Sequence, residues 1–264
     1  MNRILIKFGP FTIYYYSVII ILSILIGIYI AKKESTKLNM STYIENILFD
    51  IIIFGIIGAR AYYVIFNFSA YKSDILSIFK IWEGGIAIYG GIIGGFVAVV
   101  YNAIKQKQSI IQTTDILMPG LILAQSIGRW GNFFNQEAHG GVVTFEYLKS
   151  IHIPKFIIDG MNIDGIYYHP TFLYESLWCL LGFAILIMIR HLTKRKQGIV
   201  TYTYMIYYGI GRYIIEGIRT DSLYLGIFRV SQIVSIIIII IGIVGICISI
   251  VNKNGINQEK KNRI

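Results

Sequence analysis

Three arginines lie inside apolar runs of this 264-residue chain, where an ionisable side chain is expensive. Arg60, Arg129 and Arg212 would all be at bilayer depth if those runs cross a membrane, and an arginine at mid-helix costs roughly 2.5–3.5 kcal/mol on insertion scales. A guanidinium group is a planar fork that matches the oxygens of a phosphate. The three positions therefore favour an anionic substrate held inside a membrane protein.

The first polar cluster ends an otherwise apolar segment, GLILAQSIGRWGNFFNQEAHG. Arg129, Asn132 and Gln136 are spaced i, i+3, i+7 and would share one face of a helix. Glu137 follows them. A structural alternative stays open, in which Arg129 only pairs with a nearby carboxylate and joins two helices.

The second cluster is YYGIGRYIIEGIRTD, a polar stripe along an apolar helix. Tyr208, Arg212, Glu216 and Arg219 are spaced i, i+4, i+8, i+11. Arg212 and Glu216 could neutralise each other, which would leave Arg219 for solvent or for a ligand. Two guanidinium groups from different helices, Arg129 and Arg212, would suit a phosphate.

The third cluster is the glycine-rich segment WEGGIAIYGGIIGG. Gly90 and Gly94, like Gly91 and Gly95, are small-xxx-small pairs that permit a tight helix crossing. No Gly-Lys-Ser/Thr follows, so the segment does not predict a nucleotide-binding loop. Tyr89 is the one side chain there that could act in chemistry.

Composition indicates the elements that must position these residues. The chain is 55% hydrophobic and 14% charged, whereas an ordinary soluble domain has about 25% charged residues, and its mean hydropathy is +0.64. Several apolar runs reach the ~20 residues needed to cross a ~30 Å hydrocarbon core. We expect an all-α polytopic membrane protein of about seven transmembrane helices, near residues 12–31, 46–66, 86–103, 115–134, 171–190, 200–217 and 229–251.

Orientation follows from the distribution of Lys and Arg, which favours the cytoplasmic side. Cationic residues that follow the first, third, fifth and seventh spans, such as Lys32 and Arg190, outnumber those on the other side. We therefore expect the N-terminus outside, the C-terminus in the cytoplasm and one transmembrane domain over residues 1–264. Residues 135–170 would form a small extracytoplasmic lobe. The net charge of +10 is explained by these loops, and no nucleic-acid partner is expected.

Four segments together resemble the prolipoprotein diacylglyceryl transferase family. GRWGNFFNQE is the most specific of them, and GGIAIYGG, HPTFLYE and YGIGRYIIEGIR occur in the family's order. The resemblance implies transfer of the diacylglyceryl group of phosphatidylglycerol to the lipobox cysteine thiol of prolipoprotein signal peptides, with release of glycerol phosphate. It also implies a multi-pass protein of the bacterial plasma membrane, in contact with membrane lipids, with its active site toward the outer leaflet and no cofactor or metal.

Residue roles also follow from the resemblance, by motif position. It implies the catalytic residues Arg129, Arg212, Tyr89 and Glu137. It implies the phosphatidylglycerol-binding residues Arg129, Asn132, Tyr16, Tyr208, Glu216, Arg219 and Gly140. One position departs from the family, because Tyr89 stands where a histidine proposed as the catalytic base is often found. A positioning role is the safer interpretation of Tyr89.

Two other classes of function are compatible with buried arginines. An anion transporter or channel would use them as a selectivity filter, but no internal repeat is visible. A metal-dependent alcohol phosphotransferase or lipid phosphatase would usually carry clustered aspartates, and the sequence has no Asp-x-x-Asp pair. A purely structural membrane protein is the remaining alternative.

Overall fold

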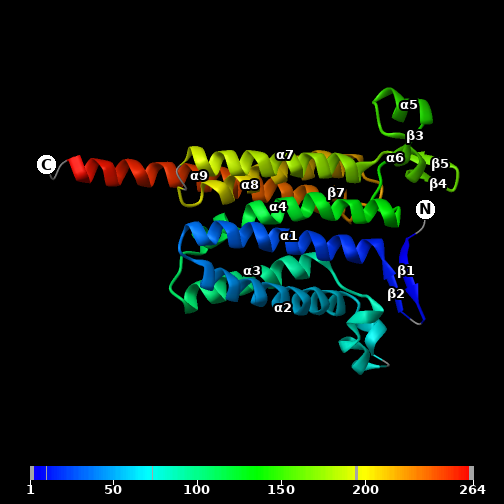
Figure 1. Ribbon diagram of the computed structural model, residues 1–264, viewed down its shortest axis with the longest axis horizontal. Helices are drawn as coiled ribbons and strands as arrows, with labels where there is room; N and C mark the ends of the chain where they lie inside the picture. The colour runs from blue at the N-terminus through cyan, green and yellow to red at the C-terminus, as the bar shows by residue number, and fades with distance from the viewer. Residues whose placement is uncertain (1–2, 10, 73, 194–195, 262–264) are drawn as a thin grey trace. The chain divides into compact units, whose positions relative to one another are not determined.

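The computed structural model describes residues 3–9, 11–72, 74–193 and 196–261. The chain forms two compact units, the first made of Met1–Ile30 and Leu117–Ile264 and the second of Ala31–Ile116. Both boundaries fall inside long helices, α1 (Tyr15–Lys37) and α4 (Ile110–Asn135), which therefore contribute to both units. The elements of each unit can be followed in Figure 1.

The first unit is built mainly from long helices. Besides its parts of α1 and α4 it contains α7 (Thr171–Leu192), α8 (Ile199–Ile218) and α9 (Val230–Lys261). Helix α8 packs against both α7 and α9. Ile122, Cys179, Leu186 and Val200 form a buried cluster that joins α4, α7 and α8. These three helices carry Arg129, Glu175 and Arg212, respectively.

Short strands lie before the first long helix and in the connections between the later helices of the first unit. They are β1 (Ile4–Phe8), β2 (Phe11–Tyr14), β3 (Val142–Val143), β4 (Asn162–Ile163), β5 (Ile166–Tyr168), β6 (Tyr224–Leu225) and β7 (Phe228–Arg229). Strands β1 and β2 pair antiparallel, as do β6 and β7, and a three-stranded sheet has the order β3-β5-β4. From the sequence we expect helices alone, because strands of two to five residues leave no periodic signal.

Residues 135–170 form a small folded region with β3, β4 and β5. It also contains α5 (Phe145–Ser150) and α6 (Lys155–Gly160). Ile157 and Met161 pack with Phe133 of α4 and Phe172 of α7 in a buried cluster. The region therefore packs against α4, which precedes it, and α7, which follows it.

The second unit holds a closely packed helix pair. Helix α2 (Ser41–Phe66) packs against α3 (Ile88–Lys105), and three short 3-10 helices connect them: η1 (Phe68–Tyr71), η2 (Ile75–Phe79) and η3 (Ile81–Glu83). A Cβ on Gly90 would collide with the carbonyl oxygen of Gly58, and one on Gly94 with that of Phe54. The packing role predicted for this glycine pair is therefore visible in the contacts.

Arg60 fixes the connection between α2 and α3. Its Nε donates to the carbonyl oxygen of Ile78 at 2.7 Å, and its Nη2 donates to that of Ser77 at 2.7 Å. Its Nη1 donates to the carbonyl oxygens of Gly84 and Gly85 at 2.7 and 2.8 Å. Four of the five donors of the guanidinium group thus bind main-chain acceptors. The expectation that Arg60 holds an anionic substrate is replaced by a structural role.

The mostly helical, polytopic character predicted from the sequence is confirmed. Among the described residues, six helices are long and apolar enough to cross a membrane: Tyr15–Lys37, Ser41–Phe66, Ile88–Lys105, Ile110–Asn135, Thr171–Leu192 and Val230–Val251. Helix α8 coincides with the predicted sixth span but is less apolar, because tyrosines and the charges of Arg212 and Glu216 lower its hydropathy. The count of seven and the orientation stay predictions.

Candidate functional site

One buried carboxylate joins two helices of the first unit through their arginines. Glu175 lies in the second turn of α7, and its Oε1 is 2.5 Å from Nη2 of Arg129 on α4. Its Oε2 is 3.3 Å from Nη1 of Arg212 on α8. Only 3% of Glu175 is exposed, and a buried charge is tolerated when it is paired and hydrogen-bonded. The two guanidinium groups therefore converge on one point.

Arg212 has two further side-chain partners in the described part of the chain. Its Nη2 lies 2.6 Å from Oε2 of Glu216, one turn further along α8, in an ion pair that lacks the alignment of a hydrogen bond. The same nitrogen donates to Oγ of Ser231 at the start of α9, at 3.3 Å. Arg229 donates to the main-chain oxygen of Glu216. Together with Arg129 and Glu175, this network contains three arginines and two carboxylates.

Hydrogen bonds between helices hold the network in place. Ser126 on α4 donates through Oγ to the main-chain oxygen of Ser176 at 2.8 Å, and Trp130 donates through Nε1 to Oγ of Ser176 at 3.2 Å. Trp178 donates through Nε1 to the main-chain oxygen of Tyr207 at 3.1 Å, and the Tyr207 hydroxyl donates back to the oxygen of Trp178 at 2.9 Å. These contacts connect α7 to α4 and α8 directly beside the buried carboxylate.

Arg129 retains hydrogen-bond donors for a ligand. Within the described part of the chain its one partner is Glu175, reached through Nη2. An arginine has five N–H donors, so the Nε and Nη1 donors of Arg129 have no hydrogen-bond partner among the residues that the structure describes. The side chains of Arg129 and Arg212 are 21% and 16% exposed, so the pair is not sealed inside the protein. Part of each arginine side chain is therefore accessible from outside the protein.

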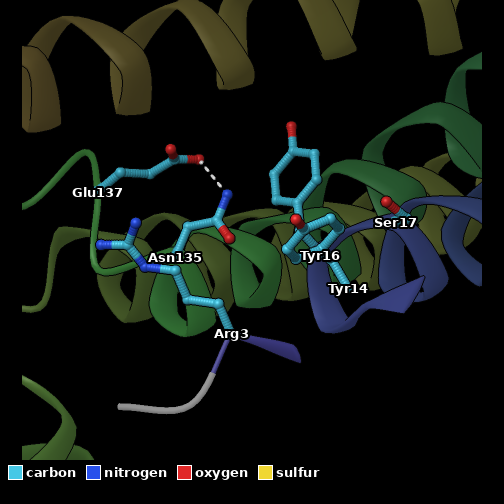
Figure 2. A pocket seen from close by; sticks show the side chains of 6 residues that line it. All are labelled: Arg3, Tyr14, Tyr16, Ser17, Asn135 and Glu137. Atoms are coloured by element: carbon cyan, nitrogen blue, oxygen red, sulfur yellow. Dashed lines mark hydrogen bonds between the residues drawn. The ribbon is translucent and has the colours of Figure 1, made fainter. Parts of the chain in front are cut away.

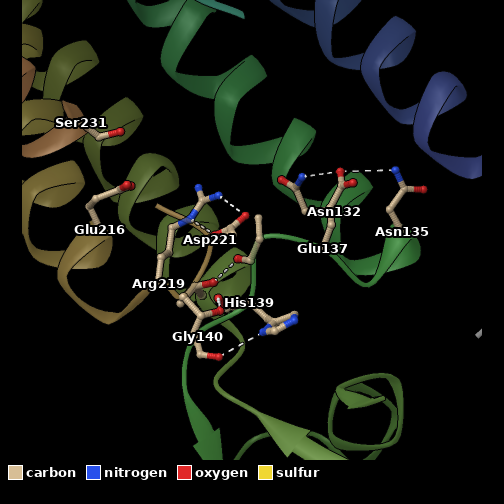
Figure 3. A network of polar contacts seen from close by, with 12 residues as sticks. Asn132, Asn135, Glu137, His139, Gly140, Glu216, Arg219, Asp221 and Ser231 are labelled. Atoms are coloured by element: carbon tan, nitrogen blue, oxygen red, sulfur yellow. Dashed lines mark hydrogen bonds and ion pairs between the residues drawn. The ribbon is translucent and has the colours of Figure 1, made fainter. Parts of the chain in front are cut away.

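The end of α4 carries a second polar group, drawn in Figure 3. Oε1 of Glu137 accepts hydrogen bonds from Nδ2 of Asn132 at 2.9 Å and from Nδ2 of Asn135 at 3.3 Å. Glu137 therefore contacts amides, whereas the carboxylates that contact Arg129 and Arg212 belong to Glu175 and Glu216.

Gln136 does not share the helix face predicted for it. Helix α4 ends at Asn135, and Gln136 has a positive φ of 52°, outside the helical region. Its Nε2 donates to the main-chain oxygen of Gly160 at 3.0 Å. The expectation that Gln136 lies on the face of Arg129 is wrong, because the helix stops one residue earlier and turns the side chain toward the 135–170 region.

A cavity of about 310 Å³ opens beside Glu137 and the start of α1. It is lined by Arg3, Tyr14, Tyr16, Ser17, Asn135 and Glu137, which are drawn in Figure 2. The ring of Tyr16 packs directly against α4 at Gly131. A Cβ on Gly131 would lie only 2.7 Å from that ring. The cavity thus combines a guanidinium, a carboxylate, an amide and hydroxyl groups, which suits a polar lipid head group.

Gly140 and Arg219 meet in the chain segments beyond α4 and α8. They form an isolated antiparallel bridge. A Cβ on Gly140 would lie 2.6 Å from that of His169, so packing requires glycine there. Arg219 donates from Nε and Nη2 to the two carboxylate oxygens of Asp221, at 2.9 and 2.8 Å. Partial burial alone would raise the pKa of Asp221, but the hydrogen bonds and charge of Arg219 outweigh it and hold that pKa below its ordinary value.

The remaining predicted residues are two tyrosines. Tyr208 of α8 stacks on Tyr204, with ring centroids 5.5 Å apart, and Tyr204 accepts a hydrogen bond from Nε2 of Gln125 at 3.0 Å. Tyr89 belongs to the second unit, where its ring centroid lies 6.4 Å from that of Tyr62.

Sequence reasoning gave no role to Glu175. Glu175 lies inside an apolar run, as the arginines do, and the cost of a charge there is a signal by which it can be identified in the sequence. Asp221 and Ser231 are more difficult to find, because nothing in their spacing links them to Arg219 or Arg212 before the chain folds.

Comparison with known proteins gives one consistent result. A family model described as prolipoprotein diacylglyceryl transferase matches residues 3–248. A phosphatidylglycerol–prolipoprotein diacylglyceryl transferase of Listeria monocytogenes is 48% identical over 248 residues, which covers 92% of this chain and 88% of that protein. The proteins of the same name from Bacillus cytotoxicus and Ligilactobacillus salivarius are each 44% identical, over 94% and 93% of this chain and 92% of their own lengths.

Proposed function

The chain belongs to the prolipoprotein diacylglyceryl transferase family, and we propose that the two guanidinium groups meeting on Glu175 form its phosphate-binding centre. It is a transferase of lipoprotein maturation, with phosphatidylglycerol and prolipoproteins as substrates. The convergence of Arg129 and Arg212 is the observation that carries the proposal.

In the proposed reaction the lipobox cysteine attacks the lipid. Its sulfur forms a C–S bond to the glyceryl carbon that carries the phosphate, the C–O bond breaks, and glycerol phosphate leaves with the bonding electrons. A free cysteine has a pKa of about 8.5, so a small fraction is thiolate at neutral pH. Nearby cations increase that fraction and stabilise the charge that develops on the departing phosphate. Arg129 and Arg212 are proposed to supply both effects.

The head group is proposed to bind at the end of α4. Tyr16 and Glu137 line the cavity, and Asn132 donates to Glu137. Hydroxyl, amide and carboxylate groups in this arrangement can bind the hydroxyls of the glycerol head group. Asn132 and Tyr16 are therefore proposed to orient the head group, with Glu137 holding Asn132 in position.

Four other residues complete the proposed site. Glu216 orients Arg212 through their ion pair. Arg219 would recruit or release phosphate, for which it must exchange the carboxylate of Asp221 for a phosphate. Gly140 keeps the chain beside Arg219 compact, and Tyr208 is proposed to contact the lipid from α8.

We propose seven spans, including α8, with the N-terminus outside and the site toward the outer leaflet. Arg129 lies in the last third of α4, Glu175 in the second turn of α7 and Arg212 in the second half of α8. These positions belong to helix ends on one side of the membrane if each helix crosses it. The positive-inside rule makes that side the outer one. The 135–170 region would then lie outside as well.

Mass spectrometry of a lipobox peptide tests the reaction. The protein is incubated in vesicles containing phosphatidylglycerol, and the peptide should gain one diacylglyceryl unit, with or without a chelator. A peptide with serine in place of the cysteine should gain nothing. Anion flux across sealed vesicles without a covalent product would instead support a channel, and loss of product with chelator would support a metal-dependent enzyme.

Tyr89→Phe tests the role of the residue that departs from the family. Phenylalanine keeps the ring and removes the hydroxyl, so a positioning residue should retain at least about a tenth of the rate. Loss of a general acid or base typically costs 10²- to 10⁴-fold. The rate of thioether formation by the purified variant is the measurement, and a loss of that size would make Tyr89 a proton carrier.

A further inference from the structure

We propose that Glu175 is a positioning residue for the transfer reaction, which sets the spacing of Arg129 and Arg212 without touching the substrate. The inference rests on the proposed phosphate-binding role of these two arginines. Each oxygen of the carboxylate serves a different helix, Oε1 at 2.5 Å from Arg129 and Oε2 at 3.3 Å from Arg212. A single side chain thus controls where both guanidinium groups lie.

Glu175 is itself held firmly enough to do this. Its helix is joined to α4 through Ser126 and Ser176, and to α8 through Trp178 and Tyr207. Only 4% of the Glu175 side chain is exposed, so water does not compete effectively for its oxygens. Reacting groups must be placed within a fraction of an ångström to be effective, and this frame fixes α7 next to both arginines.

The pairing leaves the arginines able to bind a phosphate. Arg129 uses only Nη2 for Glu175 within the described part of the chain, and its Nε and Nη1 donors are not engaged. Arg212 uses Nη1 for Glu175 and Nη2 for Glu216 and Ser231. A phosphate can therefore bind while the carboxylate keeps its contact with each guanidinium group.

The charge of Glu175 has a predictable effect on binding and on rate. Because it offsets part of the positive charge, it weakens attraction of the intact, singly charged lipid. The fixed spacing is most useful when charge accumulates on the leaving phosphate, in the transition state. Interactions of this kind affect kcat rather than KM.

Glu175→Gln separates position from charge. Glutamine has the same shape, but its amide group can accept from one arginine only and presents N–H donors to the other. We expect kcat to fall by about a hundredfold, as for a misplaced catalytic group, while KM for phosphatidylglycerol stays the same or falls. Glu175→Asp keeps the charge on a shorter side chain and should recover part of kcat.

Tyr43→Phe is the matched control. It removes a buried hydroxyl that shares a hydrogen bond of 3.0 Å with Oγ1 of Thr113, and both residues belong to the second unit, whereas Glu175 belongs to the first. This variant should lower the thermal unfolding midpoint and keep kcat within about threefold. Steady-state kinetics with phosphatidylglycerol vesicles and thermal unfolding are measured for all three variants.

The outcomes separate the two proposals. If Glu175→Gln keeps near-normal kcat while Arg129→Ala is inactive, the positioning role is wrong and the phosphate-binding centre stands. If Arg129→Ala is also active, the phosphate-binding centre itself is wrong. If Tyr43→Phe shows the same loss of kcat as Glu175→Gln at an equal fall in unfolding midpoint, the loss reflects stability alone and Glu175 is a structural residue.

Discussion

Arg129→Ala should reduce diacylglyceryl transfer at least about a hundredfold while the protein still folds and inserts. Removal of one preorganised donor to a developing negative charge typically costs 10²–10³ in rate. Counting partners in the described ranges alone, Arg129 has more unengaged donors than Arg212. Folding should be affected little, because Glu175 keeps Arg212 as its partner. Product formation in vesicles and the unfolding midpoint are the two measurements.

Two companion variants sharpen this test. Arg129→Lys keeps the charge but loses the planar fork, so its rate should fall between those of alanine and arginine. Arg212→Ala should also lose transfer, but it removes the cation that pairs with Glu216, which is 1% exposed. Breaking a buried pair typically costs 3–5 kcal/mol, so this variant should be far less stable than Arg129→Ala. Near-normal turnover in Arg129→Ala would contradict the proposed phosphate-binding centre.

The sequence predicted the long helices well because their signal is strong. The predicted spans 46–66 and 171–190 differ from α2 and α7 by at most a few residues, since runs of about twenty apolar residues admit few other structures. The free-energy cost of a charged side chain inside an apolar run indicated Arg129 and Arg212 in the same way. Their convergence was predicted from the chemistry of phosphate and not from their positions, which depend on tertiary packing.

The parts that sequence could not predict are set by single residues and distant partners. Helix α4 stops at Asn135, one residue before the face of Arg129 would have included Gln136. Arg60 lies inside an apolar run, as Arg129 does, yet the donors of Arg60 bind main-chain carbonyl oxygens. Only the folded chain shows which carboxylate or carbonyl meets each arginine.

Gly94 and Gly95 of α3 are adjacent in sequence, but we expect substitution of each by alanine to affect stability very differently. Two small-xxx-small pairs were equivalent in sequence, but a Cβ on Gly94 would collide with the main chain of Phe54, whereas one on Gly95 would lie 3.5 Å from the nearest atom, in the side chain of Ile51. Gly94→Ala should therefore force α2 and α3 apart. Gly95→Ala should be tolerated.

The difference in stability between Gly94→Ala and Gly95→Ala is measured by unfolding both variants in a denaturing detergent. Overpacking of a close contact typically costs about 1–3 kcal/mol, and a collision with backbone cannot be relieved by a rotamer change, so Gly94→Ala should lie at or above the top of that range. Alanine is a better helix former than glycine by about 1 kcal/mol, so Gly95→Ala should be neutral or slightly stabilising. Equal stabilities for the two variants would mean that the backbones of α2 and α3 do not approach each other at Gly94.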